Sequence, residues 1–265
     1  MPHVIAGACA NCGAELLGDF CHRCGQRRLG ERPLSPRPFV HQFAVELVHF
    51  DFKSGRSLLA LFRPGFLAAE FVDGRRITYL GPLKLYFLAA AIYFLIAPAI
   101  GVFSLRHDLS EDDGTLRAAI DARMAETGMR FEQFEERFNL RLNTVYTFSP
   151  MISAVAVALV LGLLYRRQRW EPGAHIVFAL YYVAFFYFAS LAAGGLYAAG
   201  GTRQPVLFAA LLYAMLIPYG FFALKRVYGG GSPAVMRKTL LLLLLTFVLD
   251  IPLNIAARAL TIRLT

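Results

Sequence analysis

Residues 80–103 read LGPLKLYFLAAAIYFLIAPAIGVF, and this long apolar run determines the class of fold to expect. About 20 apolar residues in a helix are enough to cross the hydrocarbon core of a bilayer. Four later stretches have the same character, so the sequence predicts an all-α, polytopic helical membrane protein with about five spans. We place these spans at residues 80–103, 148–165, 175–197, 206–224 and 240–260.

The composition of the chain agrees with a helical membrane protein. Of its 265 residues, 57% are hydrophobic and 17% are charged, and the mean hydropathy is +0.51. A soluble domain has about 45–50% apolar and about 25% charged residues. The net charge of +9 comes mostly from basic residues beside the apolar runs, where lipid headgroups and topology explain it. We therefore expect contact with the lipid bilayer and its anionic headgroups, and no nucleic-acid partner.

The charges beside the spans predict an orientation. Basic residues are concentrated at 56–84, 166–169 and 225–238, whereas residues 104–146 hold nine acidic and six basic residues. Because basic loops stay in the cytoplasm, we expect a cytoplasmic N-terminus in the bacterial inner membrane. The segment 104–146 and the C-terminus are then extracytoplasmic. Residues 55–72 could also dip into the membrane, which leaves the exact number of spans open.

All four cysteines lie in the first 24 residues, as Cys9, Cys12, Cys21 and Cys24. The spacing C-x2-C-x8-C-x2-C supplies four thiolates, the ligand set of a closed, structural Zn²⁺ site. A glycine after each pair allows a tight turn that aims backbone N–H groups at sulfur. We predict a structural zinc ribbon over residues 1–28. A rubredoxin-like iron site or a redox CxxC pair would use the same residues, whereas a disulfide-bonded secreted fold is not expected.

The zinc ribbon can have a purely structural role or a role in binding a protein partner. A segment of about 25 residues cannot build a hydrophobic core unaided, so the metal can serve as a folding staple. In the second role it is a docking module for a cytosolic or membrane protein partner. Phe20 is the only aromatic residue within this segment, so stacking on nucleic-acid bases is not expected.

Between the zinc ribbon and the first span the sequence changes character twice. Residues 29–38 form a basic, proline-rich linker, for which we expect extended structure. Residues 39–79 carry apolar side chains at helical spacing, with a Pro64-Gly65 break that stops one helix and lets another begin. We expect amphipathic helices that lie at the cytosolic face of the membrane.

The order of three motifs resembles a family of uncharacterised bacterial inner-membrane proteins that carry a domain-of-unknown-function label. The motifs are Cys21-His22-Arg23-Cys24-Gly25-Gln26, Arg63-Pro64-Gly65 and the box Gly74-Arg75-Arg76-Ile77-Thr78-Tyr79-Leu80-Gly81-Pro82. The resemblance covers residues 9–100. It implies a CxxCG…CxxCGQ head joined to a Pro-Gly break, a GxRxxYxxP box and several spans, and it implies no particular activity.

Arg75, Arg76 and Tyr79 of the box have two interpretations. The arginines can anchor the first span at the headgroups, with Tyr79 in the aromatic belt. Alternatively, they bind an anionic lipid headgroup or a substrate phosphate, because a guanidinium group suits bidentate contact with phosphate.

The segment 104–146 contains two amphipathic stretches separated by Gly128. This spacing predicts a small helical hairpin on the outer face. The acidic residues at 108–113 could hold a divalent cation, although a solvated loop is the commoner form of such a cluster.

Asp250 lies well inside the last apolar run, and Asn254 follows one helical turn later. An ionisable residue inside a membrane is costly and is a functional candidate by default. Pro252 frees a carbonyl nearby, so a polar pocket in a bent helix is one interpretation. In the other, Asp250 pairs with Arg203 or Arg258, or caps a helix.

No catalytic motif is present, so we do not expect an enzyme. The sequence favours a scaffold or adaptor whose zinc ribbon binds a protein partner. The alternative is a small transporter or lipid-handling protein that uses Arg75, Arg76 and Asp250. Substrate, partner and oligomeric state are not readable from the sequence, and a homo-oligomer stays open.

Overall fold

The computed structural model describes residues 7–30, 34, 53–100, 105, 114–168, 170–200 and 205–265. The predicted helix at 39–52, most of the linker, Arg203 and the acidic residues at 108–113 lie outside these residues. The described part is helical apart from the cysteine-rich head, and no strand occurs within it. The helices are α2 (Ser54–Leu61), α3 (Phe66–Val72), α4 (Pro82–Ile100), α6 (Thr115–Thr127), α7 (Phe131–Leu164), the 3₁₀ turn η1 (Arg166–Gln168), α8 (Pro172–Ala199), α9 (Pro205–Tyr228) and α10 (Ser232–Leu264).

Four helices among the described residues are long and apolar enough to cross a membrane. They are Pro82–Ile100, Pro172–Ala199, Val206–Tyr228 and Ser232–Leu264. The chain is therefore a multi-pass membrane protein with a four-cysteine cluster near its N-terminus. The other expected span, 148–165, coincides with Met151–Leu164, a shorter apolar stretch at the end of α7. A fifth crossing stays a prediction.

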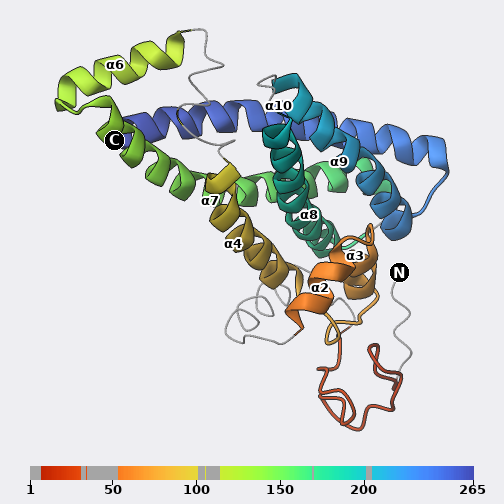
Figure 1. Cartoon of the computed structure of the whole chain (residues 1–265). Helices are drawn as coiled ribbons and strands as arrows, with labels where there is room; N and C mark the ends of the chain where they lie inside the picture. The colour runs from red at the N-terminus through yellow and green to blue at the C-terminus, as the bar shows by residue number, and fades with distance from the viewer. Residues whose placement is uncertain are drawn as a thin grey trace.

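Helix α8 lies at the centre of the bundle, packed against α3, α4, α7 and α9 (Figure 1). In its most apolar window, 72% of the residues are buried inside the protein. Tyr187 of α8 meets Tyr93 of α4 at a ring-centroid distance of 4.9 Å, and Phe185 stacks on Tyr219 of α9 at 3.6 Å. Because lipid solvates apolar side chains as well as protein does, such close packing is what holds spans together.

The short helices α2 and α3 dock onto the same bundle through their backbone carbonyls. Tyr219 of α9 donates to the Leu61 carbonyl at 2.9 Å, and Arg226 donates to the Pro64 carbonyl at 2.6 Å. Tyr181 of α8 donates to the Leu80 carbonyl at 2.8 Å. Free carbonyls at helix ends need partners where water is scarce. The spans therefore hold the α2–α3 segment in a fixed place.

Helices α7 and α10 pack along each other and reach beyond the other helices (Figure 1). At 1.5 Å per residue, each is about 50 Å long, against about 30 Å for the hydrocarbon core. With α6 they form a second apolar cluster that includes Ile120, Phe134, Phe138 and Ile262. Gly128, with a φ of 67°, ends α6 at the point where the sequence placed the break. The C-terminus lies with this cluster, at the opposite end from the head.

We predict that Gly65→Ala destabilises the protein by about 2 kcal/mol or more, because the site combines strain with a clash. Gly65 has a φ of +67°, and an added Cβ would lie 2.7 Å from the Cα and the carbonyl oxygen of Ala223. Thermal unfolding in detergent measures the effect. Gly55→Ala is the matched control, since its Cβ would meet nothing within 4 Å. Equal melting temperatures for the two variants would contradict the α3–α9 contact.

Candidate metal centre

The two cysteine pairs build the same turn twice, 12 residues apart. Gly13 donates to the Cys9 carbonyl and Gly25 to the Cys21 carbonyl, both at 2.8 Å. The two glycines have φ values of 75° and 73°, which side chains with a Cβ rarely adopt. The N–H groups of Cys9 and Cys21 then donate to the carbonyls at positions 14 and 26, again both at 2.8 Å. The glycine in each CxxCG unit is thus required by the turn itself.

The two turns bring the four sulfur atoms together. Cys9 Sγ lies 3.6 Å from Cys24 Sγ, and Cys12 Sγ lies 3.6 Å from Cys21 Sγ. All four atoms lie within 4.8 Å of one another. A disulfide would need about 2.05 Å, whereas a tetrahedral site with metal–sulfur bonds of about 2.3 Å has sulfur–sulfur edges of about 3.8 Å. The cluster therefore has the spacing of a four-thiolate metal site.

The surroundings of the cluster shift two of its thiols in opposite directions. N–H groups of Cys24 and Arg23 lower the pKa of Cys21 to about 6, which favours the thiolate form. The Ala14 backbone lowers the pKa of Cys12, but burial and the neighbouring thiols together raise it to about 11. Cys9 and Cys21 are buried, whereas Cys12 and Cys24 are half-buried. Each pair thus supplies one inner and one outer sulfur.

Gln26 joins this cysteine cluster to the membrane body. Its side chain is buried, its Nε2 donates to the Gly74 carbonyl at 2.8 Å, and its Oε1 accepts from the Arg76 N–H at 3.1 Å. An amide side chain that satisfies a donor and an acceptor of one backbone segment fixes that segment in both position and direction. The final residue of the CxxCGQ motif therefore binds the box that precedes α4.

The loop at Gly74 lies too close to the head for a larger residue. Gly74 has a φ of +93°, and an added Cβ would lie 2.9 Å from both Ala10 and Leu29. Thr78 adds a weaker hydrogen bond to Asn11 at 3.4 Å. Figure 1 shows the head beside the α2–α3 end of the bundle, away from the spans. The head is consequently held by specific contacts at one end of the protein.

The arginines of the box are engaged within the protein. Arg75 makes two hydrogen bonds of 2.7 Å to Glu70 and one of 3.0 Å to Asp73, and the contact with Glu70 raises its pKa. Arg76 is only 8% exposed and lies over the Phe71 ring at 4.5 Å. These contacts favour the anchoring interpretation, because an anion would compete with two carboxylates at Arg75. Anion binding by this pair stays a prediction.

The other residues singled out in the sequence lie apart from the metal centre. Tyr79 packs edge-on against Phe66 of α3 at 5.5 Å. Asn254 is exposed on α10, in which Asp250 and Pro252 also lie. The Asp250 side chain is outside what the structure describes, so an intramembrane polar site there stays a prediction.

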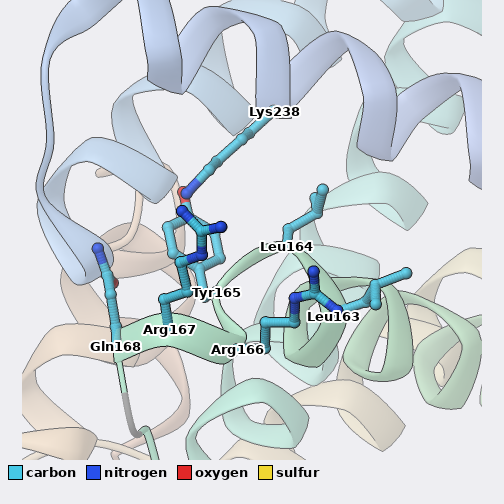
Figure 2. Close-up of a pocket in the computed structure, with 7 residues that line it drawn as sticks. All are labelled: Leu163, Leu164, Tyr165, Arg166, Arg167, Gln168 and Lys238. Carbon is cyan, nitrogen blue, oxygen red and sulfur yellow. The ribbon is translucent and has the colours of Figure 1, made fainter.

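Two features of the structure could not be predicted from the sequence. Leu17 and Phe20 of the head are 80% and 63% exposed, and apolar spacing at a helical period gives no sign of an exposed apolar pair between two turns. A basic cavity lies between the end of α7 and the start of α10 (Figure 2). In the sequence, Arg166, Arg167 and Lys238 were explained by the orientation of the spans. No local sequence pattern indicates that residues about 70 positions apart line one cavity.

Comparison with known proteins gives one partial match. Residues 53–94, from α2 into α4, match a family model described as Protein of unknown function (DUF3667). No curated protein and no solved structure matches the chain. The matched segment contains both the α2–α3 docking site and the box that Gln26 binds.

We predict that Gln26→Ala releases the box from the head. Loss of both hydrogen bonds at a buried site costs about 1–3 kcal/mol, so trypsin should cleave after Arg76 about tenfold faster. Mass spectrometry of timed digests in detergent measures this rate. Gln168→Ala, an exposed glutamine away from the head, should digest like the wild type. If Gln26→Ala also digests like the wild type, the head is not held by this residue.

Proposed function

We propose that this chain is an adaptor of the bacterial inner membrane whose zinc ribbon binds a protein partner in the cytoplasm. The observation that carries the proposal is the double hydrogen bond of Gln26 to Gly74 and Arg76. A metal staple that served only to fold its own segment would not need to be fixed to the membrane body. A head that is already held in one orientation loses less conformational freedom when a partner binds, so the entropy cost of binding is lower.

Zinc is the metal that the proposal assigns to the site. Four thiolates at tetrahedral spacing suit Zn²⁺, and a site with four protein ligands leaves no position for a substrate. The metal then has a structural role. It holds the two turns together, because the head is too small to have a hydrophobic core of its own.

Leu17 and Phe20 form the proposed contact with the partner. They lie on the connection between the two turns, whereas the contacts with the membrane body come from Ala10, Asn11 and Gln26. Exposed side chains of both signs lie next to the apolar pair along the chain, Glu15 and Asp19 among them, and Arg28 donates to the Leu16 carbonyl at 3.1 Å. An apolar centre with a polar rim of both signs is typical of a protein interface.

The alternative proposal is a small transporter or lipid-handling protein. It would use Arg75 and Arg76 at the inner face and Asp250 inside the membrane. Arg75 is already paired with Glu70 and Asp73, so this route requires those pairs to open. The adaptor needs no such rearrangement, and we therefore favour it.

We predict one zinc ion per chain in the purified protein, bound by four sulfur atoms. Metal analysis gives the stoichiometry, and X-ray absorption at the zinc edge gives the ligands and the metal–sulfur distance. Cys21→Ser should lower the zinc content severalfold, because it removes one of four ligands. His22→Ala, an exposed neighbour of that cysteine, should leave it unchanged. Iron in place of zinc, or nitrogen and oxygen ligands, would contradict the assignment.

We predict that a photo-crosslinking amino acid at position 20 captures one protein stoichiometrically in intact cells. The partner, once identified and purified, should bind the wild-type protein in nanodiscs. Binding should weaken about tenfold or more in Leu17→Ser/Phe20→Ser, since central apolar side chains dominate interface energy. Glu15→Gln, at the polar rim, should bind nearly as well as the wild type.

The proposal fails if position 20 crosslinks only to lipid or to many proteins at low yield. It also fails if the purified partner binds Leu17→Ser/Phe20→Ser as tightly as the wild type. Zinc content measured on the same samples shows whether the head of each variant is intact.

A further inference from the structure

A basic cavity of about 390 Å³ lies at the end of α7, which is within the range of small-ligand sites (Figure 2). Three of its seven lining residues are cationic and none is acidic. The lining residues are Leu163, Leu164, Tyr165, Arg166, Arg167, Gln168 and Lys238. The cavity therefore has the charge of an anion site, with an apolar side formed by the two leucines.

The base of the cavity is a fixed aromatic group. Tyr165 stacks on Tyr228 of α9 at a centroid distance of 4.1 Å, and Tyr228 in turn bonds His175 of α8 at 2.8 Å. Lys238 of α10 places its Nζ 3.6 Å from the centre of the Tyr165 ring. Helices α8, α9 and α10 thus hold Tyr165 and Lys238 in position, so the fold fixes this side of the cavity, and the exposed side chains of residues 166–168 complete the lining.

The Tyr165 hydroxyl is a second sign of a ligand. The Tyr165 side chain is 2% exposed, and its oxygen has no hydrogen-bond partner among the described residues. A buried hydroxyl without a partner is costly. A ligand oxygen that displaced the side chains covering this hydroxyl would accept its hydrogen bond and would also neutralise the adjoining cations.

An apolar stripe leads from the body of α7 into this cavity. Ile152, Val155, Leu159 and Leu163 recur every three or four residues, and each is more than half exposed. This spacing places them on one face of the helix. The last of them, Leu163, also lines the cavity. A ligand that follows the stripe would have an apolar tail and an anionic end.

We propose that this cavity binds the phosphate of an anionic phospholipid, with its acyl chains along the α7 stripe. Arginine guanidinium groups suit phosphate oxygens, and basic pockets between spans at the inner face bind anionic headgroups. The cavity lies at the same end as the head, because α9 contributes both Tyr228 here and Arg226 at the α2–α3 turn. This site is independent of the adaptor role, of Arg75 and of Arg76.

The test is native mass spectrometry of the full-length protein in mild detergent, titrated with palmitoyl-oleoyl phosphatidylglycerol or phosphatidylcholine. We expect one tightly bound phosphatidylglycerol, with phosphatidylcholine binding about tenfold more weakly. Arg167→Ala/Lys238→Ala should lose about thirtyfold in affinity for phosphatidylglycerol, at roughly 1 kcal/mol per basic residue. Tyr165→Phe, which removes only the hydroxyl, should lose about threefold or more.

The matched control is Lys225→Ala/Arg237→Ala, which removes two cations at the same end that do not line the cavity. It should keep the wild-type affinity, and thermal unfolding should show that every variant is folded. A second variant, Arg166→Ala/Arg167→Ala, changes only exposed side chains and should also bind phosphatidylglycerol more weakly.

Inorganic phosphate distinguishes the lipid from a free anion. On the proposal, phosphate at millimolar concentration displaces phosphatidylglycerol only weakly, because it lacks the apolar contacts. Phosphate binding at the cavity without phosphatidylglycerol binding would overturn the lipid assignment. Equal loss of phosphatidylglycerol in the cavity and control variants would overturn the site.

Discussion

Helix α8 is the buried centre around which α3, α4, α7 and α9 pack. Between membrane helices there is little hydrophobic driving force, so association relies on close packing and on hydrogen bonds. Helix α8 provides both, through aromatic contacts with α4 and α9 and through Tyr181, which bonds the Leu80 carbonyl at 2.8 Å. That bond fixes the chain immediately before α4. Each aromatic pair contributes about 0.5–1.5 kcal/mol beyond its buried area.

From α8, a series of hydrogen bonds leads outward to the cysteine cluster. Helix α9 holds the α2–α3 turn through Tyr219 and Arg226. The turn positions the box, and Gln26 of the head binds the box at Gly74 and Arg76. The segment that matches the family of unknown function, residues 53–94, is thus the part that connects the spans with the cysteine cluster. The motif residues of this segment are explained by the contacts they make: the Pro64 carbonyl accepts from Arg226, and the backbone of Gly74 and Arg76 bonds Gln26.

The sequence was sufficient for the features that are local or repeated. Apolar runs predicted the spans, the spacing of Cys9, Cys12, Cys21 and Cys24 predicted their cluster, and Pro64-Gly65 predicted the break between α2 and α3. The hydrogen bond between Gln26 and Arg76 and the contact of Lys238 with the Tyr165 ring could not be predicted from local sequence patterns. Each pair is at least 50 residues apart, and only the packing of the spans brings it together. The motif residues were visible in the sequence, but their contact was not.

Gln26 fixes the cysteine-rich head to the membrane body through the Arg76 backbone. This attachment can be followed by hydrogen exchange of the Arg76 amide in nanodiscs, before and after treatment with a metal chelator. With the metal bound, the amide should be protected by its bond to Gln26. After metal removal, protection should fall at Arg76 while the amides in the middle of α8 stay protected. Unchanged protection at Arg76 after complete metal loss would show that the metal does not keep the head attached to the membrane body.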